Sequence, residues 1–497
     1  MVSSVRLTVR LSPTRLRQWH LRLLGRLAKR PGTIVTVVWA SGGATLPSAV
    51  PLLFALERLI YRLADARISD AALPGDFAPF TTALPLAADL VIDLSATDPA
   101  AGEPAGDRTW RLTFDGVSDE AAAIGALAQG RTPVLGVVDA ASGRQIVSGH
   151  PGTENKHSIV LAFEDVLARA ATLITAALDG AATRYGGSLS PAVSAGPLTI
   201  SRFALRSLSN AIARRLYRLC YQAPHWRVGW RFVDGPDVID LRALPDRGWH
   251  DLADDGRRFY ADPFPAIQDG RMYLFLEDFA HRLGRAVISA VEFGPRGPVG
   301  MPRPVLDTGS HASYPFVFQY QDQTWMVPET CSTATVDLYR SSAFPDRWVR
   351  EATLLSGIVA SDATLFEHGR RWWMLATVQG GAGSHSDVLH AWSADTPLGP
   401  WRPHERNPIL VDVASARPAG TVVIRAGRII RPVQNCTDGY GAALGLAEII
   451  RLDDETFEQR VDAVLRPGRG WPGRRLHTLN RVGRLECIDG SRSLRKF

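Results

Sequence analysis

The sequence predicts a multidomain protein, an N-terminal α/β domain followed by an all-β five-bladed propeller. Over residues 3–180, apolar runs of strand length alternate with helical stretches, whereas residues 226–497 hold short, aromatic-rich strands with almost no helical periodicity. The second region also contains an internal repeat. A chain of 497 residues is long for one hydrophobic core. We therefore predict domains at 1–180 and 226–497, joined by residues 181–225.

The N-terminal region has the spacing of βαβ units. The predicted elements are strands at 5–11, 33–39, 90–94 and 132–138 and helices at 13–29, 48–63 and 158–178. Strand and helix patterns in alternation are typical of a parallel, doubly wound sheet of Rossmann type.

The joining segment has two parts. Residues 181–200 are rich in Gly, Ser, Ala and Pro, which is typical of a linker. Residues 201–221 are predicted to form a helix with arginines set among Leu and Ala. A basic amphipathic helix can lie on an anionic membrane, which would give peripheral membrane contact through 201–221. Packing between two domains, with the arginines in solvent, is the favoured alternative.

The repeat after residue 226 predicts the propeller. Three segments align without gaps, ADPFPAIQDGRMYLFLE, SYPFVFQYQDQTWMVPE and SDATLFEHGRRWWMLAT, and each reads as a β-hairpin. Two further copies, ARPAGTVVIRAGRIIRPVQ and LHTLNRVGRLECIDG, follow. The five copies begin 52, 48, 55 and 60 residues apart, which leaves room for one four-stranded blade each.

Equivalent positions of such a repeat meet at one end of the propeller axis, because the innermost strand of each blade lies along the central channel. The residues in the second place of each copy are Asp262, Tyr314, Asp362, Arg417 and His477, and the residues expected beside them are Glu277, His311, Glu329, Gln434 and Tyr440. Grouped carboxylates repel one another and perturb their pKa values, which is common at functional sites. We therefore predict a carboxylate-rich pocket of the sugar-binding type.

Within this set we assign Asp262, Glu329 and Asp362 as the catalytic acids and the others as substrate-binding residues, because paired carboxylates suit glycoside chemistry. For the two aspartates, the alternative is a turn-capping role at a strand start. Arg417 has the alternative of a purely structural ion pair. Glu277 and Asp278 compete, since only one of two successive strand residues can face the channel.

Composition excludes several other classes. The net charge is +6, but the basic residues are scattered among 50 acidic ones, so no nucleic-acid partner is predicted. No motif with metal-ligand spacing and no P-loop occurs, and the α/β region 1–180 has no GxGxxG, so the prediction is no metal and no cofactor. The N-terminus carries arginines and no apolar core, and no run of 18 apolar residues follows, so the predicted location is cytoplasmic.

Two resemblances concern the propeller. ADPFP with YLFLE resembles the first blade of glycoside hydrolase family 43, in which the Asp matched by Asp262 is the catalytic base or nucleophile; that family opens blades two and three with Asp and Glu, where this chain has Tyr314 and Asp362. HASYPFVF, WMVPET, DATLFEHGRRWWM, ARPAG and RPVQNC resemble more closely the propeller of plant glucosamine inositolphosphorylceramide transferases, which bacterial proteins also carry. This resemblance implies that a separate domain performs the sugar transfer in the plant proteins.

The N-terminal region resembles, more faintly, the formyltransferase fold. That family uses an Asn, a His in an HxSLLP-like segment and a later Asp, but here the strand LVIDLS is followed by ATDPAAGEPAG without a His. The resemblance therefore implies a degenerate, inactive formyltransferase-like domain.

Two functions follow. The first is a carbohydrate-active enzyme, a glycosidase or glycosyltransferase that acts on a saccharide or glycolipid, with a nucleotide sugar as a further candidate partner. The alternative is a non-catalytic glycan-binding or scaffold protein in polysaccharide or glycolipid biosynthesis, and sugar N-formylation ranks last. Two acids about 5–10 Å apart with open space between them would favour catalysis. If Arg417 fills that space, binding is favoured.

Overall fold

The computed structural model describes residues 5–41, 45–63, 66–81, 87–97, 108–181, 183–222, 224–380 and 382–496. The chain forms two compact units, divided between Ala213 and Arg214, with residues 382–384 grouped with the first unit. Of the His-free segment 96–106, residues 98–106 lie outside the described residues.

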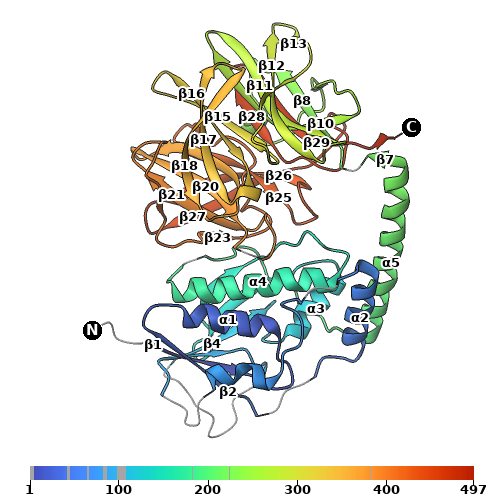
Figure 1. Ribbon diagram of the computed structural model, residues 1–497, viewed down its shortest axis with the longest axis vertical. Coiled ribbons are helices and arrows are strands. Elements are labelled where there is room, and N and C mark those ends of the chain that lie inside the picture. The colour runs from blue at the N-terminus through green and yellow to red at the C-terminus, as the bar shows by residue number, and fades with distance from the viewer. Residues whose placement is uncertain are drawn as a thin grey trace. The chain divides into compact units, whose positions relative to one another are not determined.

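The first unit contains one mixed six-stranded sheet in the order β2-β1-β3-β4-β5-β6 (Figure 1). Its strands are β1 (Val5–Leu11), β2 (Thr33–Trp39), β3 (Leu90–Asp93), β4 (Thr109–Phe114), β5 (Leu135–Asp139) and β6 (Gln145–Gly149). The first four pair in parallel, as the βαβ spacing predicts. The prediction of a wholly parallel sheet is wrong for β5 and β6, which pair antiparallel. A short turn joins β5 to β6, and a parallel crossover between them would need a longer connection. Strand β5 also pairs antiparallel with β4, although residues 115–134 separate the two strands.

Helices accompany this sheet. They are α1 (Gln18–Ala28), α2 (Ala49–Tyr61), α3 (Glu120–Ala128), α4 (Ile159–Leu178) and the 3-10 helix η1 (Pro74–Phe80). The predicted apolar side of the first helix is confirmed, since Trp19, Leu23 and Leu27 are all buried. The helix after the linker, α5 (Pro197–Cys220), begins within the predicted linker. None of the described helices is long and apolar enough to cross a membrane.

The second unit is a propeller of five sheets (Figure 1). Blade one holds β10 (Arg258–Gln268), β11 (Arg271–Ala280), β12 (Arg285–Gly294), β13 (Gly297–Pro298) and β14 (Arg303–Leu306); blade two holds β15 (Ser313–Tyr320), β16 (Gln323–Glu329), β17 (Thr335–Ala343) and β18 (Arg347–Ser356). Blade three holds β19 (Ala360–His368), β20 (Arg371–Val378), β21 (Val388–Ala394), β22 (Arg402–Pro403) and β23 (Leu410–Val411); blade four holds β24 (Val423–Arg425), β25 (Arg428–Asn435), β26 (Ala443–Leu452) and β27 (Phe457–Leu465). The gap-free repeats are the first two strands of blades one to three.

Blade five is built from both ends of the unit. Its order is β28-β29-β8-β9, in which β28 (Leu479–Val482) and β29 (Leu485–Ser491) come from the C-terminal end, while β8 (Trp226–Phe232) and β9 (His250–Asp251) come from the beginning of the propeller. This arrangement closes the ring, because β8 pairs with the edge of β29 that β28 leaves free. The short elements outside the blades are α6 (Val238–Leu241), η2 (Cys331–Thr333) and the pair β7 (Tyr221–Gln222) with β30 (Leu494–Arg495).

Candidate functional site

A bulge interrupts the first strand in each of blades one to three. The pairing shifts register after Ala261, Ser313 and Ser361. The next residues, Asp262, Tyr314 and Asp362, have positive φ angles of 48°, 43° and 56°. Non-glycine residues rarely adopt this conformation, and a bulge changes the direction of the side chain that it carries. The position that repeats in the sequence therefore has the same bulge and the same left-handed backbone in blades one, two and three.

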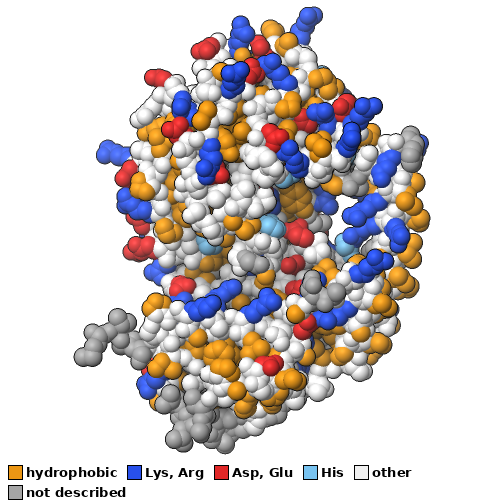
Figure 2. All heavy atoms as spheres, viewed as in Figure 1, with side chains coloured by type: hydrophobic (Ala, Val, Ile, Leu, Met, Phe, Trp, Pro, Cys, Tyr) orange, Lys and Arg blue, Asp and Glu red, His pale blue; other side chains and the backbone are white. Residues whose placement is uncertain are grey.

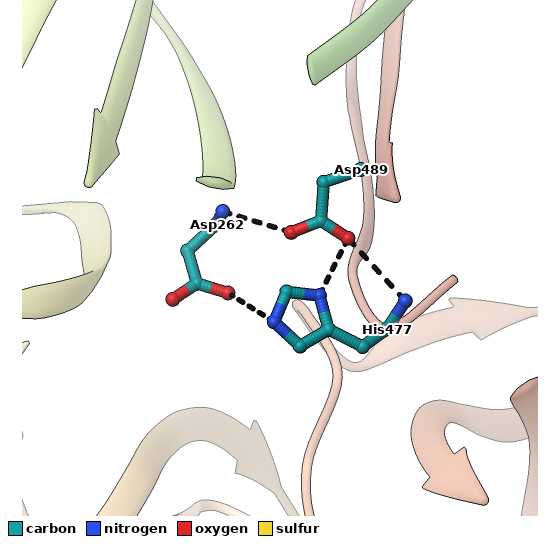
Figure 3. A group of neighbouring side chains, drawn as sticks. All are labelled: Asp262, His477 and Asp489. Atoms are coloured by element: carbon teal, nitrogen blue, oxygen red, sulfur yellow. Dashed lines mark hydrogen bonds and ion pairs between the residues drawn. The ribbon is translucent and has the colours of Figure 1, made fainter. Parts of the chain in front are cut away.

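Asp262, His477 and Asp489 form a buried hydrogen-bonded group (Figure 3). His477 Nδ1 donates to Asp489 Oδ1 at 2.6 Å, and the backbone N–H of Asp262 donates to Asp489 Oδ2 at 3.0 Å. His477 Nε2 lies 3.6 Å from Asp262 Oδ1, which also accepts a hydrogen bond from Thr478 Oγ1 at 2.8 Å. Blade one and blade five are thus joined by charge-assisted contacts.

The charges in this group shift each other's pKa values. Burial alone would lower the pKa of His477, but the adjacent Asp489 and Asp262 carboxylates outweigh burial and raise it. Burial raises the pKa of Asp262 to about 6, with Asp489 and Asp362 adding to the rise and His477 opposing it. The two neighbouring carboxyl groups therefore favour the protonated form of the imidazole.

This same group is the one that could hold a metal ion among the described residues. One ligand atom from each of the three side chains lies within 4.8 Å of the other two. His477 Nδ1 is already used as a donor to Asp489, so Nε2 would be the nitrogen ligand.

Arg417 lies between Glu329 and Asp362 and pairs with both. Its Nε donates to Asp362 Oδ2 at 2.6 Å, and its Nη2 donates to Glu329 Oε2 at 3.5 Å. Glu329 also accepts the backbone N–H of Asp362, while Gln434 Nε2 donates to Asp362 Oδ2 at 2.9 Å. Burial raises the pKa of Asp362 to about 7, against the effect of Arg417. The two predicted acids are thus engaged by one guanidinium.

Glu277, and not Asp278, faces the acidic group. Burial raises the pKa of Glu277 well above its usual range, and Asp262 and Glu329 raise it further. Its Oε1 lies 3.6 Å from His311 Nε2. His311 Nδ1 accepts the Ala286 N–H, so Nε2 carries the proton that points toward Glu277. Asp278 instead pairs with Arg258 and accepts a hydrogen bond from Ser289.

The remaining predicted residues differ in their surroundings. Tyr314 is wholly buried; its hydroxyl contacts Thr364 Oγ1 and accepts the Gly420 N–H, each at 2.8 Å. The hydroxyl group of Tyr314 is therefore already hydrogen-bonded to other residues of the protein. The ring of Tyr440 lies under Arg417, whose guanidinium carbon is 5.0 Å from the ring centroid. Tyr440 is only partly buried.

Sequence reasoning missed Asp489 and Trp226. Asp489 lies near the end of the second strand of blade five, the place that Glu277 and Glu329 occupy in blades one and two. The hairpin of blade five is shorter, so the repeat spacing did not reach it. Trp226 stacks on His477, with ring centroids 4.1 Å apart and planes inclined by 16°. No local signal distinguishes it from the other tryptophans.

Known proteins resemble the propeller half of the chain. Residues 251–487 match the protein family described as "Glucosamine inositolphosphorylceramide transferase 1, N-terminal". Two curated relatives carry the name "Glucosamine inositolphosphorylceramide transferase 1". The rice protein is 29% identical over 259 residues, which cover 47% of this chain and 33% of the relative. The Arabidopsis thaliana protein is 30% identical over 228 residues, which cover 44% and 30%. The chain thus spans about a third of the length of these relatives.

Solved structures show a fainter likeness. An exo-beta-1,3-galactanase from Phanerochaete chrysosporium has a TM-score of 0.31 and 13% identity, covering 38% of this chain and 47% of that one. An alpha-L-arabinofuranosidase from Clostridium thermocellum has a TM-score of 0.31 and 13% identity, covering 44% and 79%. Likeness at this level does not bear on ligand or activity. In sequence, the propeller is similar to the N-terminal region of glucosamine inositolphosphorylceramide transferases.

Proposed function

We propose that this chain is a carbohydrate-active protein that receives a sugar residue of a glycan or glycolipid at the axial end of its propeller. The observation that supports this most is the convergence of charged groups. Five carboxyl groups, those of Asp262, Glu277, Glu329, Asp362 and Asp489, gather near Arg417 and His477. Carboxylates and an arginine in fixed positions suit the hydroxyl groups of a sugar.

An approaching ligand would meet the accessible edge of this cluster. The His311 side chain is 39% exposed and that of Glu277 10%, whereas Asp262 and His477 are nearly inaccessible. Glu329 and Tyr440 are also partly exposed. The proposal therefore assigns direct sugar contacts to Glu277, His311, Glu329 and Tyr440. The more deeply buried side chains would hold the contacting ones in position; these are Asp262, Asp362, Arg417, Gln434 and His477.

The position of Arg417 favours a protein that binds a sugar without using Glu329 and Asp362 to hydrolyse it. A carboxylate that serves as base or nucleophile must have its charge available to the reacting atom, and both of these carboxylates accept hydrogen bonds from the guanidinium. Neutralised in this way, they suit binding better than bond cleavage.

Catalysis is the second candidate, and Glu277 is the residue that favours it. Burial raises the pKa of Glu277 well above its usual range, and the neighbouring carboxylates raise it further, which favours the protonated form of this carboxyl group. A carboxyl group that keeps its proton is what a general acid for a glycosidic oxygen requires. In a glycosidase mode, Glu277 would protonate the departing glycosidic oxygen, while a water molecule adds to the sugar carbon and gives its proton to a neighbouring carboxylate.

The names of the relatives suggest the first ligands to test, a hexosamine and an inositol phosphoryl sphingolipid headgroup. Nucleotide sugars belong in the same panel, because a transferase would need one as donor. A glycolipid ligand also requires contact with a bilayer, which residues 201–221 would provide. The cytoplasmic location and a formyltransferase-like, inactive first unit are parts of the same proposal.

The test combines binding and product analysis on the full chain. The panel of glycosides, headgroups and nucleotide sugars is titrated by calorimetry, and chromatography detects cleaved or transferred sugar. Glu277→Gln and Asp262→Asn are compared with Glu367→Gln, an exposed acid on the first strand of blade three. Turnover lost in Glu277→Gln and kept in Glu367→Gln would establish catalysis. Binding without turnover supports recognition, and no binding of any saccharide contradicts the proposal.

A further inference from the structure

Helix α5 has an apolar face that the described residues leave exposed. Its buried residues, Ile200, Phe203 and Ser207, lie on one side. The opposite side carries six exposed aliphatic side chains at helical spacing: Leu198, Leu205, Leu208, Ile212, Leu216 and Leu219, which are 45–72% exposed. Figure 2 shows hydrophobic side chains along the right-hand edge of α5 in that view. A contiguous apolar stripe of this kind marks an interaction surface.

Arginines of the helix border this stripe, and the helix itself contains no Asp or Glu. On a helical wheel, Arg202 and Arg215 fall on its two sides, and both are exposed. Among the described residues, neither side chain forms an ion pair or hydrogen bond. No Asp or Glu occurs anywhere between Asp179 and Asp234. The helix therefore carries only positive charge, and among the described residues the charges of Arg202 and Arg215 are available to an external partner.

We infer that α5 lies flat on an anionic lipid surface, with its leucine stripe in the acyl boundary and its arginines at the phosphate level. The arrangement fits an interfacial helix, because apolar burial and attraction to anionic lipids act on the same element. With five arginines the helix does not span a bilayer. Arginine stems can cover apolar surface while the guanidinium stays among headgroups.

A second copy of the chain would suit this face less well. Two α5 helices packed stripe to stripe would place arginine beside arginine, with no carboxylate on either helix to pair with them. An anionic bilayer supplies the missing negative charge. The inference supports a glycolipid ligand but does not depend on the sugar site, so either can fail alone.

Vesicle co-sedimentation of the full chain tests the inference. We expect binding to vesicles of phosphatidylcholine with about 30% phosphatidylserine, and none to phosphatidylcholine alone. The double variant Leu205→Glu/Ile212→Glu should bind the anionic vesicles at least about tenfold more weakly. Arg202→Ser/Arg215→Ser should weaken binding roughly tenfold and reduce its salt dependence. Leu283→Glu, which changes an exposed leucine of the propeller, should bind like the wild type.

Failure to bind anionic vesicles, or equal weakening by Leu283→Glu, would overturn the inference. Light scattering tests whether a second copy of the chain covers the stripe instead of a membrane. A wild-type dimer that becomes monomeric in Leu205→Glu/Ile212→Glu would assign the stripe to a second copy. Circular dichroism of each variant verifies that α5 is retained. The substituted side chains are exposed, so loss of folding is not expected.

Discussion

Asp262 connects three blades of the propeller. Its Oδ2 accepts the Tyr314 N–H of blade two at 3.2 Å, and its Oδ1 accepts the Thr478 hydroxyl of blade five. Its own N–H donates to Asp489. The left-handed backbone at Asp262 makes this orientation possible, and strain of about 1–3 kcal/mol is typical of such a conformation. Its carboxyl group thus serves the structure as well as the proposed site.

Replacement of Asp262 by Asn should change how stability depends on pH. The pKa of this carboxyl rises from 3.8 to about 6 in the fold, so the folded state holds the proton more tightly than the unfolded chain. The resulting stability is fully present below about pH 4 and is lost as pH rises through 6. Between pH 4.5 and 7.5, the free energy of unfolding of the wild type should fall relative to Asp262→Asn by about 1–3 kcal/mol.

Denaturant unfolding at several pH values measures this difference. Asp307→Asn is the control, because hydrogen bonding to Arg285 lowers the pKa of that carboxyl to about 2. The stability that the Asp307 carboxylate contributes is lost only as pH falls through 2. The difference in free energy of unfolding between Asp307→Asn and the wild type should therefore stay constant from pH 4.5 to 7.5. A constant difference for Asp262→Asn as well would contradict the raised pKa.

Strand β8 decides whether the ring of blades closes. Gly229 in this strand pairs with Ile488 of β29 and with Asp251 of β9. A Cβ atom at Gly229 would lie 2.6 Å from Cη2 of Trp471, which is buried. Glycine is required here by the close approach of an indole ring, although a glycine inside a strand usually weakens it.

Gly229→Ala should therefore destabilise the propeller by about 1–3 kcal/mol, because the buried Trp471 ring must shift to admit the methyl group. Gly235→Ala is a matched control shortly after the same strand, where an added Cβ meets nothing within 4 Å. The free energy of unfolding of Gly235→Ala should stay within about 0.5 kcal/mol of the wild-type value. Thermal unfolding followed by tryptophan fluorescence compares the two. Equal stability of both variants would show that the ring can move freely.

The fold and the site were predictable to different degrees at the level of elements. The hairpins of blades one to three follow from the gap-free repeat, and β1 and β2 have the predicted bounds. The strands β4 and β6 and the helix α3 were not predicted. Helix α3 is buried on nearly all sides, so it shows no amphipathic periodicity in sequence. The bulges were also not predicted, because their left-handed residues are not glycines.

At the scale of the whole molecule, the propeller depends on joining its two ends. Blade five takes strands from residues 226–251 and 479–491. Without β8, the edge of β29 would be open, and an open inner strand is a site of aggregation.

We expect that a chain of residues 214–497, which keeps β8, folds and unfolds cooperatively, whereas residues 233–497 aggregate. The reason is that only the longer chain can close the ring. Size-exclusion chromatography and thermal denaturation of the two chains measure the difference. Equal unfolding midpoints would contradict a stabilising role of the closing strand.

The repeat alone established five blades and brought Asp262, Asp362, Arg417 and His477 to one end, because equivalent positions in a closed ring must converge. Their chemistry needed the tertiary structure. Pairing of Arg417 with two acids from other blades, and of His477 with Asp489, depends on ångström-scale approach between strands far apart in sequence. Burial, which sets the protonation of Asp262 and Glu277, likewise arises only when the blades pack together.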